Sequence, residues 1–166
     1  MIIRKKLVNG FTLLEVLIAL LVLSVGLLGL ASLQTRGLAA GHNAYLRSQA
    51  VLLALDMAER IRANTTHIAN NQTGSGSNYN FDWDRSINSS AKNCVFDENV
   101  SGTPCTASEL ATFDGEQWLT ALSNTLPSGE GRVNQSDRDY TIIVRWDQDG
   151  DTNPDNHKTY TYQLNL

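Results

Sequence analysis

Apolar positions are concentrated in the first third of the chain, and their pattern predicts one long helix. From Phe11 to Leu33, 23 residues carry a single charge, that of Glu15. A helix of this length spans about 35 Å, which is enough to cross a bilayer. The helical pattern continues from Gln34 to Asn64 in two adjacent stripes: Leu46, Ala50, Leu53, Met57 and Ile61 in one, and Tyr45, Leu52 and Leu55 in the other. This wide arc predicts burial on two sides, against the chain's own C-terminal part and against neighbouring chains, although a simple core helix of a small domain is an alternative.

The rest of the chain is polar and shows shorter periods. Residues 65–92 are rich in Asn, Ser, Thr and Gly and predict a long loop; within it Tyr79, Phe81 and Trp83 alternate with polar residues, which favours a short strand over an exposed contact patch. The segment 106–126 predicts a short helix, capped by Thr106 or Ser108, with Trp118 as a packed anchor.

Two alternating strands close the chain. Their apolar faces consist of Tyr140, Ile142, Val144 and Trp146 in the first, and of Tyr160, Tyr162, Leu164 and Leu166 in the second. They are expected to pair as an antiparallel hairpin and to cover the long helix. The predicted fold class is therefore α+β, with a long N-terminal helix packed on a small antiparallel sheet.

Charge predicts the orientation of the chain in a membrane. Arg4, Lys5 and Lys6 precede the apolar run, whereas Arg36 follows it alone, so residues 34–166 are expected on the exported, periplasmic side of a single-pass protein. The two cysteines, Cys94 and Cys105, match neither a CxxC pair nor zinc-ligand spacing. In an oxidising compartment they predict one disulfide, and two reduced, buried thiols are the alternative.

Composition excludes several functional classes. The net charge is −4, and without Arg4, Lys5 and Lys6 the chain has 10 basic and 17 acidic residues, a net charge of −7. This is a poor match for a protein that binds duplex nucleic acid, so no nucleic-acid partner is expected. His42, His67 and His157 lack ligand spacing, and no phosphate-binding loop or GxSxG motif occurs, so no enzyme activity is expected.

An acidic segment between the two C-terminal strands is a candidate calcium site. Its carboxylates are those of Asp147, Asp149, Asp151 and Asp155. They are hard oxygen ligands, but the glycine falls early for an EF-hand and no glutamate stands at the twelfth position. A solvated acidic turn explains the same residues, so no cofactor is expected beyond this candidate for calcium.

Glu15 is the residue of the apolar run that most needs an explanation, because ionisable groups inside a bilayer are costly and usually functional. If the chain is cut between Gly10 and Phe11, the new α-amino group of Phe11 is cationic. Glu15 of an adjoining chain can then neutralise it in the apolar interior, which sets the axial register of stacked helices.

The residues on both sides of this site carry a family resemblance. The string Lys-Lys-Leu-Val-Asn-Gly at residues 5–10, followed by Phe-Thr-Leu-Leu-Glu-Val-Leu-Ile-Ala at residues 11–19, resembles the type III signal of type IV pilins and secretion pseudopilins. The resemblance implies that a prepilin peptidase cuts after Gly10 and methylates Phe11, and that Glu15 directs subunit docking. The mid-helix proline of many major pilins is missing, and Gly26 and Gly29 are the sites where this helix can melt locally.

Two further segments narrow the resemblance. Residues 47–64, and less specifically residues 118–131, resemble the PilV group of minor pilins, called type IV pilus modification proteins. This implies a minor pilin of the inner membrane that joins a pilus and primes assembly or forms part of its tip, with roles in twitching motility and adhesion. The implied partners are the peptidase, other minor pilins and the major pilin, the inner-membrane assembly platform and a tip adhesin.

The expected organisation follows from these segments. It comprises a cleaved leader at 1–10, a membrane and assembly half of the helix at 11–33, an amphipathic half at 34–64, and a periplasmic α+β head at 65–166. Two other functions fit the same sequence. The first is a minor pseudopilin of a type II secretion or competence system, and the second is an uncleaved, membrane-anchored periplasmic binding domain.

Overall fold

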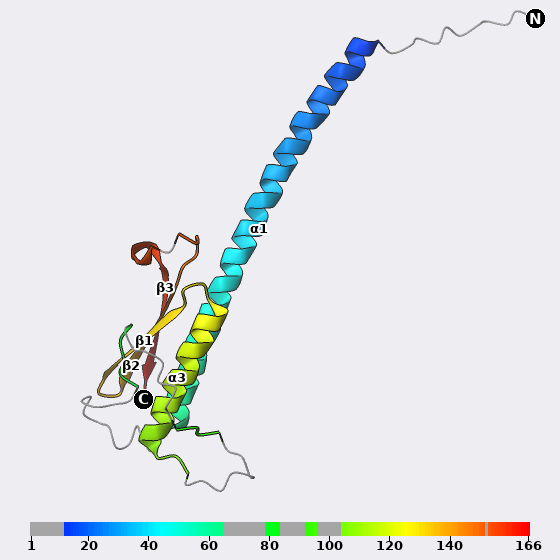
Figure 1. Ribbon diagram of the computed structural model, residues 1–166. Helices are drawn as coiled ribbons and strands as arrows, with labels where there is room; N and C mark the ends of the chain where they lie inside the picture. Colours follow the sequence, from blue (N-terminus) through cyan, green and yellow to red (C-terminus); the bar gives the residue numbers. More distant parts are fainter. Residues whose placement is uncertain (1–11, 65–78, 84–91, 96–103, 152) are drawn as a thin grey trace, which may run out of the picture. The chain divides into compact units, whose positions relative to one another are not determined.

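The computed structural model describes residues 12–64, 79–83, 92–95, 104–151 and 153–166 of the 166-residue chain. The leader, the expected cleavage site at Gly10 and Phe11, and most of the loop predicted at 65–92 lie outside the described residues. The elements are α1 (Leu13–Ala63), α3 (Ala107–Thr125), β1 (Glu130–Ser136), β2 (Asp139–Trp146), a 3₁₀ turn (Pro154–Asn156) and β3 (Lys158–Asn165). Figure 1 shows these elements, with colours that follow the sequence from blue at the N-terminus to red at the C-terminus.

Contacts divide the chain into two units, residues 1–42 and 43–166, and α1 contributes to both. In the first unit the described part of α1 is exposed throughout. It contains the one helical segment among the described residues that is apolar and long enough to cross a membrane, with a mean hydropathy of 2.7.

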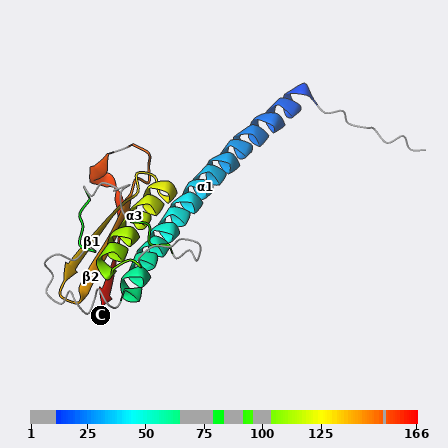
Figure 2. The ribbon, with the colours of Figure 1, turned by 60° about the horizontal axis from the view of Figure 1, so that its bottom comes forward.

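The second unit, called the head below, is a two-layer α+β structure. Its sheet has the order β1–β2–β3 with both pairs antiparallel, so the predicted hairpin of β2 and β3 is confirmed. Figure 2 shows α3 and the C-terminal half of α1 beside this sheet. The long helix on a small antiparallel sheet is the fold class that the sequence predicts.

The core of the head lies between the helices and one face of the sheet. Leu46, Ala50, Met57 and Ile61 of the first predicted stripe of α1 are buried there, and Leu53 is partly buried. Ala54 and Ala58, which the predicted stripe did not include, are buried beside them. The sheet contributes its alternating apolar face, with Val133, Tyr140, Ile142, Val144, Trp146 and Leu164 buried. The small side chains of Ala50, Ala54 and Ala58 lie on the buried face of α1, so the neighbouring elements can pack close to the helix backbone.

Helix α3 closes the core and is fixed at its start and at its centre. Thr106 is the N-cap, and with Glu109 it forms a reciprocal capping box that satisfies backbone N–H groups at the start of the helix. Trp118 is fully buried, contacts Phe81 edge to face, and donates its indole N–H to the carbonyl oxygen of Leu53 in α1, at 2.8 Å. The prediction that Trp118 is a packing anchor is therefore confirmed.

Strand β1 has no alternating pattern that predicts a strand. This strand reads Glu-Gly-Arg-Val-Asn-Gln-Ser and has one apolar residue, Val133, which is fully buried. Gly131 lies against α3, where a β-carbon would overlap the ring of Trp118 and the side chain of Leu122. The strand predicted around Phe81 is reduced to a single antiparallel bridge with Val133, on the edge of β1 away from β2.

The close approach of Gly131 to α3 gives a test of this packing. Gly131→Ala should destabilise the head by about 1–3 kcal/mol, because the added methyl group overpacks a core with no room for it. The measurement is urea unfolding of the detergent-solubilised full chain, followed by near-ultraviolet circular dichroism. Gly41→Ala is the control: it has no neighbour within 4 Å and should be neutral or slightly stabilising. Equal unfolding midpoints for the two variants would contradict the packing described.

Candidate functional site

The N-terminal half of α1 carries an exposed apolar surface, in which Glu15 is the one charged residue before Arg36. Between Leu13 and Leu38 every large hydrophobic side chain is exposed. Thr12 opens the helix, and its hydroxyl accepts a hydrogen bond from the backbone N–H of Glu15 at 3.3 Å. The helix macrodipole favours an acidic residue in this first turn. Among the described residues the Glu15 carboxylate has no cationic partner, so the structure leaves it available to another chain.

In the head, α1 also has exposed apolar side chains, on the side that the sheet does not cover. Tyr45 and Leu52 belong to the second predicted stripe and are 56% and 59% exposed. Leu52 and Val51 line a shallow groove of about 530 Å³ together with Ala44, Arg47 and Ser48. The head therefore buries one stripe of α1 and leaves most of the other open, as the width of the apolar arc predicts for a helix with outside partners.

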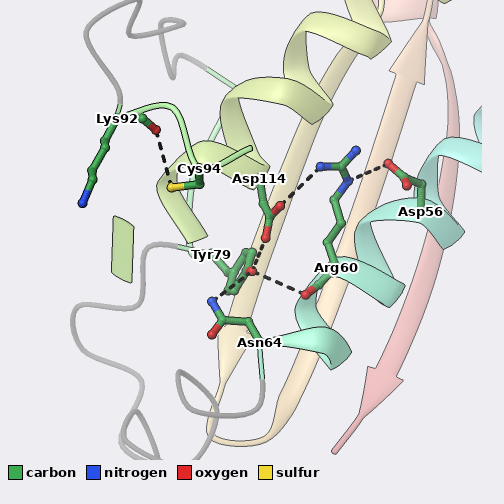
Figure 3. A network of polar contacts seen from close by, with 7 residues as sticks. All are labelled: Asp56, Arg60, Asn64, Tyr79, Lys92, Cys94 and Asp114. Carbon is green, nitrogen blue, oxygen red and sulfur yellow. Dashed lines mark hydrogen bonds and ion pairs between the residues drawn. The ribbon is translucent and has the colours of Figure 1, made fainter. Parts of the chain in front are cut away.

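A polar network ties the end of α1 to α3 and to the short segment 79–83 (Figure 3). The buried Asp114 of α3 accepts hydrogen bonds from Arg60 Nη1 at 3.3 Å and from the hydroxyl of Tyr79 at 2.7 Å. Arg60 also donates through Nε to Asp56, at 2.9 Å. Asn64, just after the last turn, donates to the carbonyl oxygen of Ala107 at 2.7 Å and lies 3.4 Å from the Tyr79 hydroxyl.

Burial sets the properties of this network. Asp114 and the side chain of Tyr79 are shielded from water, so each needs its partner in order to avoid the cost of an unsatisfied buried polar group. Burial, together with the hydrogen bond to Asp114, raises the pKa of Tyr79 above its ordinary value of 10.0. The network therefore fixes the point at which the chain leaves α1 relative to the start of α3.

The disulfide predicted between Cys94 and Cys105 is present, with Cα atoms 5.7 Å apart. It lies next to the capping box of α3, where Lys92 pairs with Glu109 at 3.2 Å. The dashed line from Cys94 to Lys92 in Figure 3 is a 3.5 Å contact rather than a hydrogen bond, because a disulfide sulfur carries no proton.

The structure brings three of the four candidate calcium ligands together. One carboxylate oxygen of each of Asp147, Asp149 and Asp151 lies within 4.8 Å of the others. Asp147 is buried, and its Oδ1 accepts the backbone N–H groups of Asp149 and Gly150, as in an acidic turn. Asn156 donates to both Asp149 and Asp151, and Asp155 is not part of the cluster. Turn chemistry accounts for these contacts.

Sequence reasoning missed the Arg60–Asp114–Tyr79 network. Its members are up to 54 residues apart, and each has a common surface role by itself. Arg60 lies in a segment with a helical period and Tyr79 in an alternating segment, and neither pattern predicts which side chains meet across the core.

Comparison with known families adds two matches. The sequence model described as type IV pilin Tt1218 (Tt1218-like) matches residues 32–115, just over half of the chain. The model of the prokaryotic N-terminal methylation motif matches residues 5–31, which include Gly10, Phe11 and Glu15. No curated protein and no solved structure matches the chain significantly.

The buried hydroxyl of Tyr79 predicts a pH-dependent stability. Tyr79→Phe should lower the free energy of unfolding by about 1–3 kcal/mol at neutral pH, because Asp114 loses a buried donor. A tyrosine whose pKa is raised in the folded state stabilises the head below its unfolded pKa, and this contribution is lost as the pH rises above 10. The alkaline loss of stability should therefore be smaller in the variant. Part of it remains, because burial also raises the pKa of Tyr140.

Urea titrations of the full chain at pH 7, 9, 10 and 11 measure this effect. Tyr45→Phe is the control. Because Tyr45 is exposed, this substitution should change neither the free energy of unfolding at pH 7 nor its loss at alkaline pH. If Tyr79→Phe and Tyr45→Phe show the same midpoints at every pH, the Tyr79 hydroxyl is not the buried donor described.

Proposed function

Because the chain belongs to the Tt1218-like family of type IV pilins, we propose that it is a minor pilin of the PilV group, which joins a type IV pilus and primes its assembly or forms part of its tip. The observation that carries this proposal is the division of α1 into two surfaces. One stripe is buried in the chain's own head, whereas the large apolar side chains from Leu13 to Leu38, and those of Tyr45 and Leu52, are exposed and have no partner within the described residues.

In this proposal the subunit is first inserted into the inner membrane and is processed there. The apolar half of α1 holds it there as a single-pass protein, with the head in the periplasm. The positive charges at Arg4, Lys5 and Lys6 support this orientation, and so does the disulfide, since disulfides persist in oxidising compartments. A prepilin peptidase then cuts between Gly10 and Phe11 and methylates Phe11, consistent with the methylation motif that covers them.

Filament entry uses the exposed surface of α1. The cationic terminus created at Phe11 meets Glu15 of an adjoining subunit, and the two charges neutralise one another in the apolar filament interior. Apolar packing supplies the energy of assembly, and the charge pair sets the axial register. Other minor pilins and the major pilin are the partners of this surface, while the head selects the inner-membrane assembly platform and a tip adhesin as its contacts.

A deletion experiment tests the pilus assignment. Loss of the protein should abolish or greatly reduce surface pili and twitching motility while protein export continues, because the missing subunit primes a pilus. Electron microscopy of the cell surface, a twitching assay and an export assay measure the three properties in one strain. Normal pili with defective export would instead assign the chain to a secretion pseudopilus.

The role of Glu15 predicts a specific loss. Glu15→Gln should lower the amount of the subunit in sheared filaments by more than about tenfold while its amount in the membrane stays normal. Breaking a buried charge pair by removing one partner costs about 3–5 kcal/mol, and the head does not contain Glu15. Quantitative immunoblotting of sheared filaments and membranes gives both values.

The matched control is Glu59→Gln, since Glu59 is an exposed carboxylate of the same helix and forms an ion pair only with Arg62 among the described residues. It should enter filaments at the normal level. Unchanged incorporation of Glu15→Gln would remove the register role of this residue.

A further inference from the structure

A polar groove of about 430 Å³ lies in the head where the first turns of α1 in this unit face the ends of β2 and β3. It is lined by Asn43, Ala44, Arg47, Trp146, Gln148, Lys158 and Thr159. Trp146 ends β2 and is paired across the sheet with Lys158, the first residue of β3. Three elements that are distant in sequence therefore contribute to one site.

Trp146 lines this groove, and its indole N–H is an unsatisfied donor among the residues that the structure describes. The side chain is only 3% exposed. Trp118, in contrast, donates its indole N–H to a backbone carbonyl. Buried indole N–H groups usually have a partner, because an unpaired buried donor is costly. An acceptor from outside the chain would satisfy Trp146, and the long, exposed side chains of Arg47 and Lys158 can move to admit it.

The charge of the groove indicates which acceptor fits. Arg47 and Lys158 have no ion-pair partner among the described residues, and no acidic side chain lines the groove. Asp147 follows Trp146 in sequence, but its Oδ1 is held by the N–H groups of its own turn. In a chain with a net charge of −4, two unpaired cations and an unsatisfied N–H donor in one groove favour an oxyanion.

The surroundings of the groove indicate that a protein supplies this oxyanion. Ala44 and Arg47 also line the apolar groove of Val51 and Leu52 on the open side of α1. A protein segment that covers Val51 and Leu52 with apolar side chains lies next to Arg47, where an acidic side chain of the same segment can reach the groove. A free phosphate has no apolar part to cover this neighbouring surface.

We propose that the groove formed by Arg47, Trp146 and Lys158 binds the carboxylate of an aspartate or glutamate side chain on a neighbouring pilin subunit. The guanidinium of Arg47 and the ammonium of Lys158 neutralise the carboxylate, and the indole N–H of Trp146 donates to one of its oxygens. The identity of the partner rests on the proposed function, whereas the affinity of the groove for a carboxylate does not.

The first experiment tests the groove chemistry on the isolated full chain in a neutral detergent. The three tryptophans give three indole resonances in a ¹H–¹⁵N correlation spectrum, and Trp146→Phe and Trp83→Phe assign them. Titration with sodium acetate should shift the Trp146 N–H downfield in a saturable manner, and sodium chloride at the same ionic strength should not. The Trp118 and Trp83 resonances should stay in place and report that the fold is intact.

Charge variants, and a titration with inorganic phosphate as a second anion, test whether the response is specific to the groove and to a carboxylate. The double variant Arg47→Gln/Lys158→Gln should lose the acetate response, while Arg62→Gln/Arg138→Gln, which removes the same charge elsewhere on the head, should keep it. Three outcomes would overturn the proposal: no response to acetate, an acetate response that persists in Arg47→Gln/Lys158→Gln, or a response to inorganic phosphate without one to acetate.

The second experiment tests the partner in the native cell. Arg47→Gln/Lys158→Gln should be processed normally but be reduced severalfold in sheared filaments, while Arg62→Gln/Arg138→Gln enters them at the normal level. Equal incorporation of the two double variants would overturn the neighbouring-subunit assignment alone. If the wild-type chain itself is unprocessed or missing from filaments, the proposed function fails, and the acetate titration still decides the chemistry of the groove.

Discussion

The packing of the C-terminal half of α1 into the head is the interaction on which the rest of the structure depends. The small side chains of Ala50, Ala54 and Ala58 let other elements pack close to the buried face of the helix. Trp118 of α3 donates its indole N–H to the backbone carbonyl of Leu53 in α1. This contact places α3 beside α1, and the absence of a side chain at Gly131 then lets β1 close over Trp118. The buried face of the sheet is shared with the two helices, so β1, β2 and β3 pack on the same core as α1 and α3.

The same packing separates the two surfaces of α1. Within the head, one stripe is buried in the core, and the adjacent stripe, including Tyr45 and Leu52, is exposed. The Arg60–Asp114–Tyr79 network and the disulfide both act near the C-terminal end of the helix, where the chain leaves it. The head is therefore held by contacts that do not use the open surface, which leaves that surface available for other subunits.

How much could be predicted from the sequence depends on whether a feature is local. The long helix, the capped helix at α3 and the strands β2 and β3 have clear periods, and Cys94 and Cys105 were the only cysteines to pair. Strand β1 has no such period, since Val133 is its one apolar residue and its position depends on contact with Trp118. The polar network and the Arg47–Trp146–Lys158 groove join residues from separate elements, so only the tertiary structure brings them together. For Glu15 the sequence indicated a partner in another chain, and a single chain cannot contain it.

The central claim is that this chain is processed as a prepilin and becomes part of a filament through the open surface of α1. The most direct measurement is the intact mass and N-terminal sequence of the protein recovered from sheared surface filaments of its native cell. The account predicts a chain that begins at N-methylated Phe11 and is present in the filament fraction. A chain that still begins at Met1 and stays in the membrane, in a cell with an active prepilin peptidase, would contradict it.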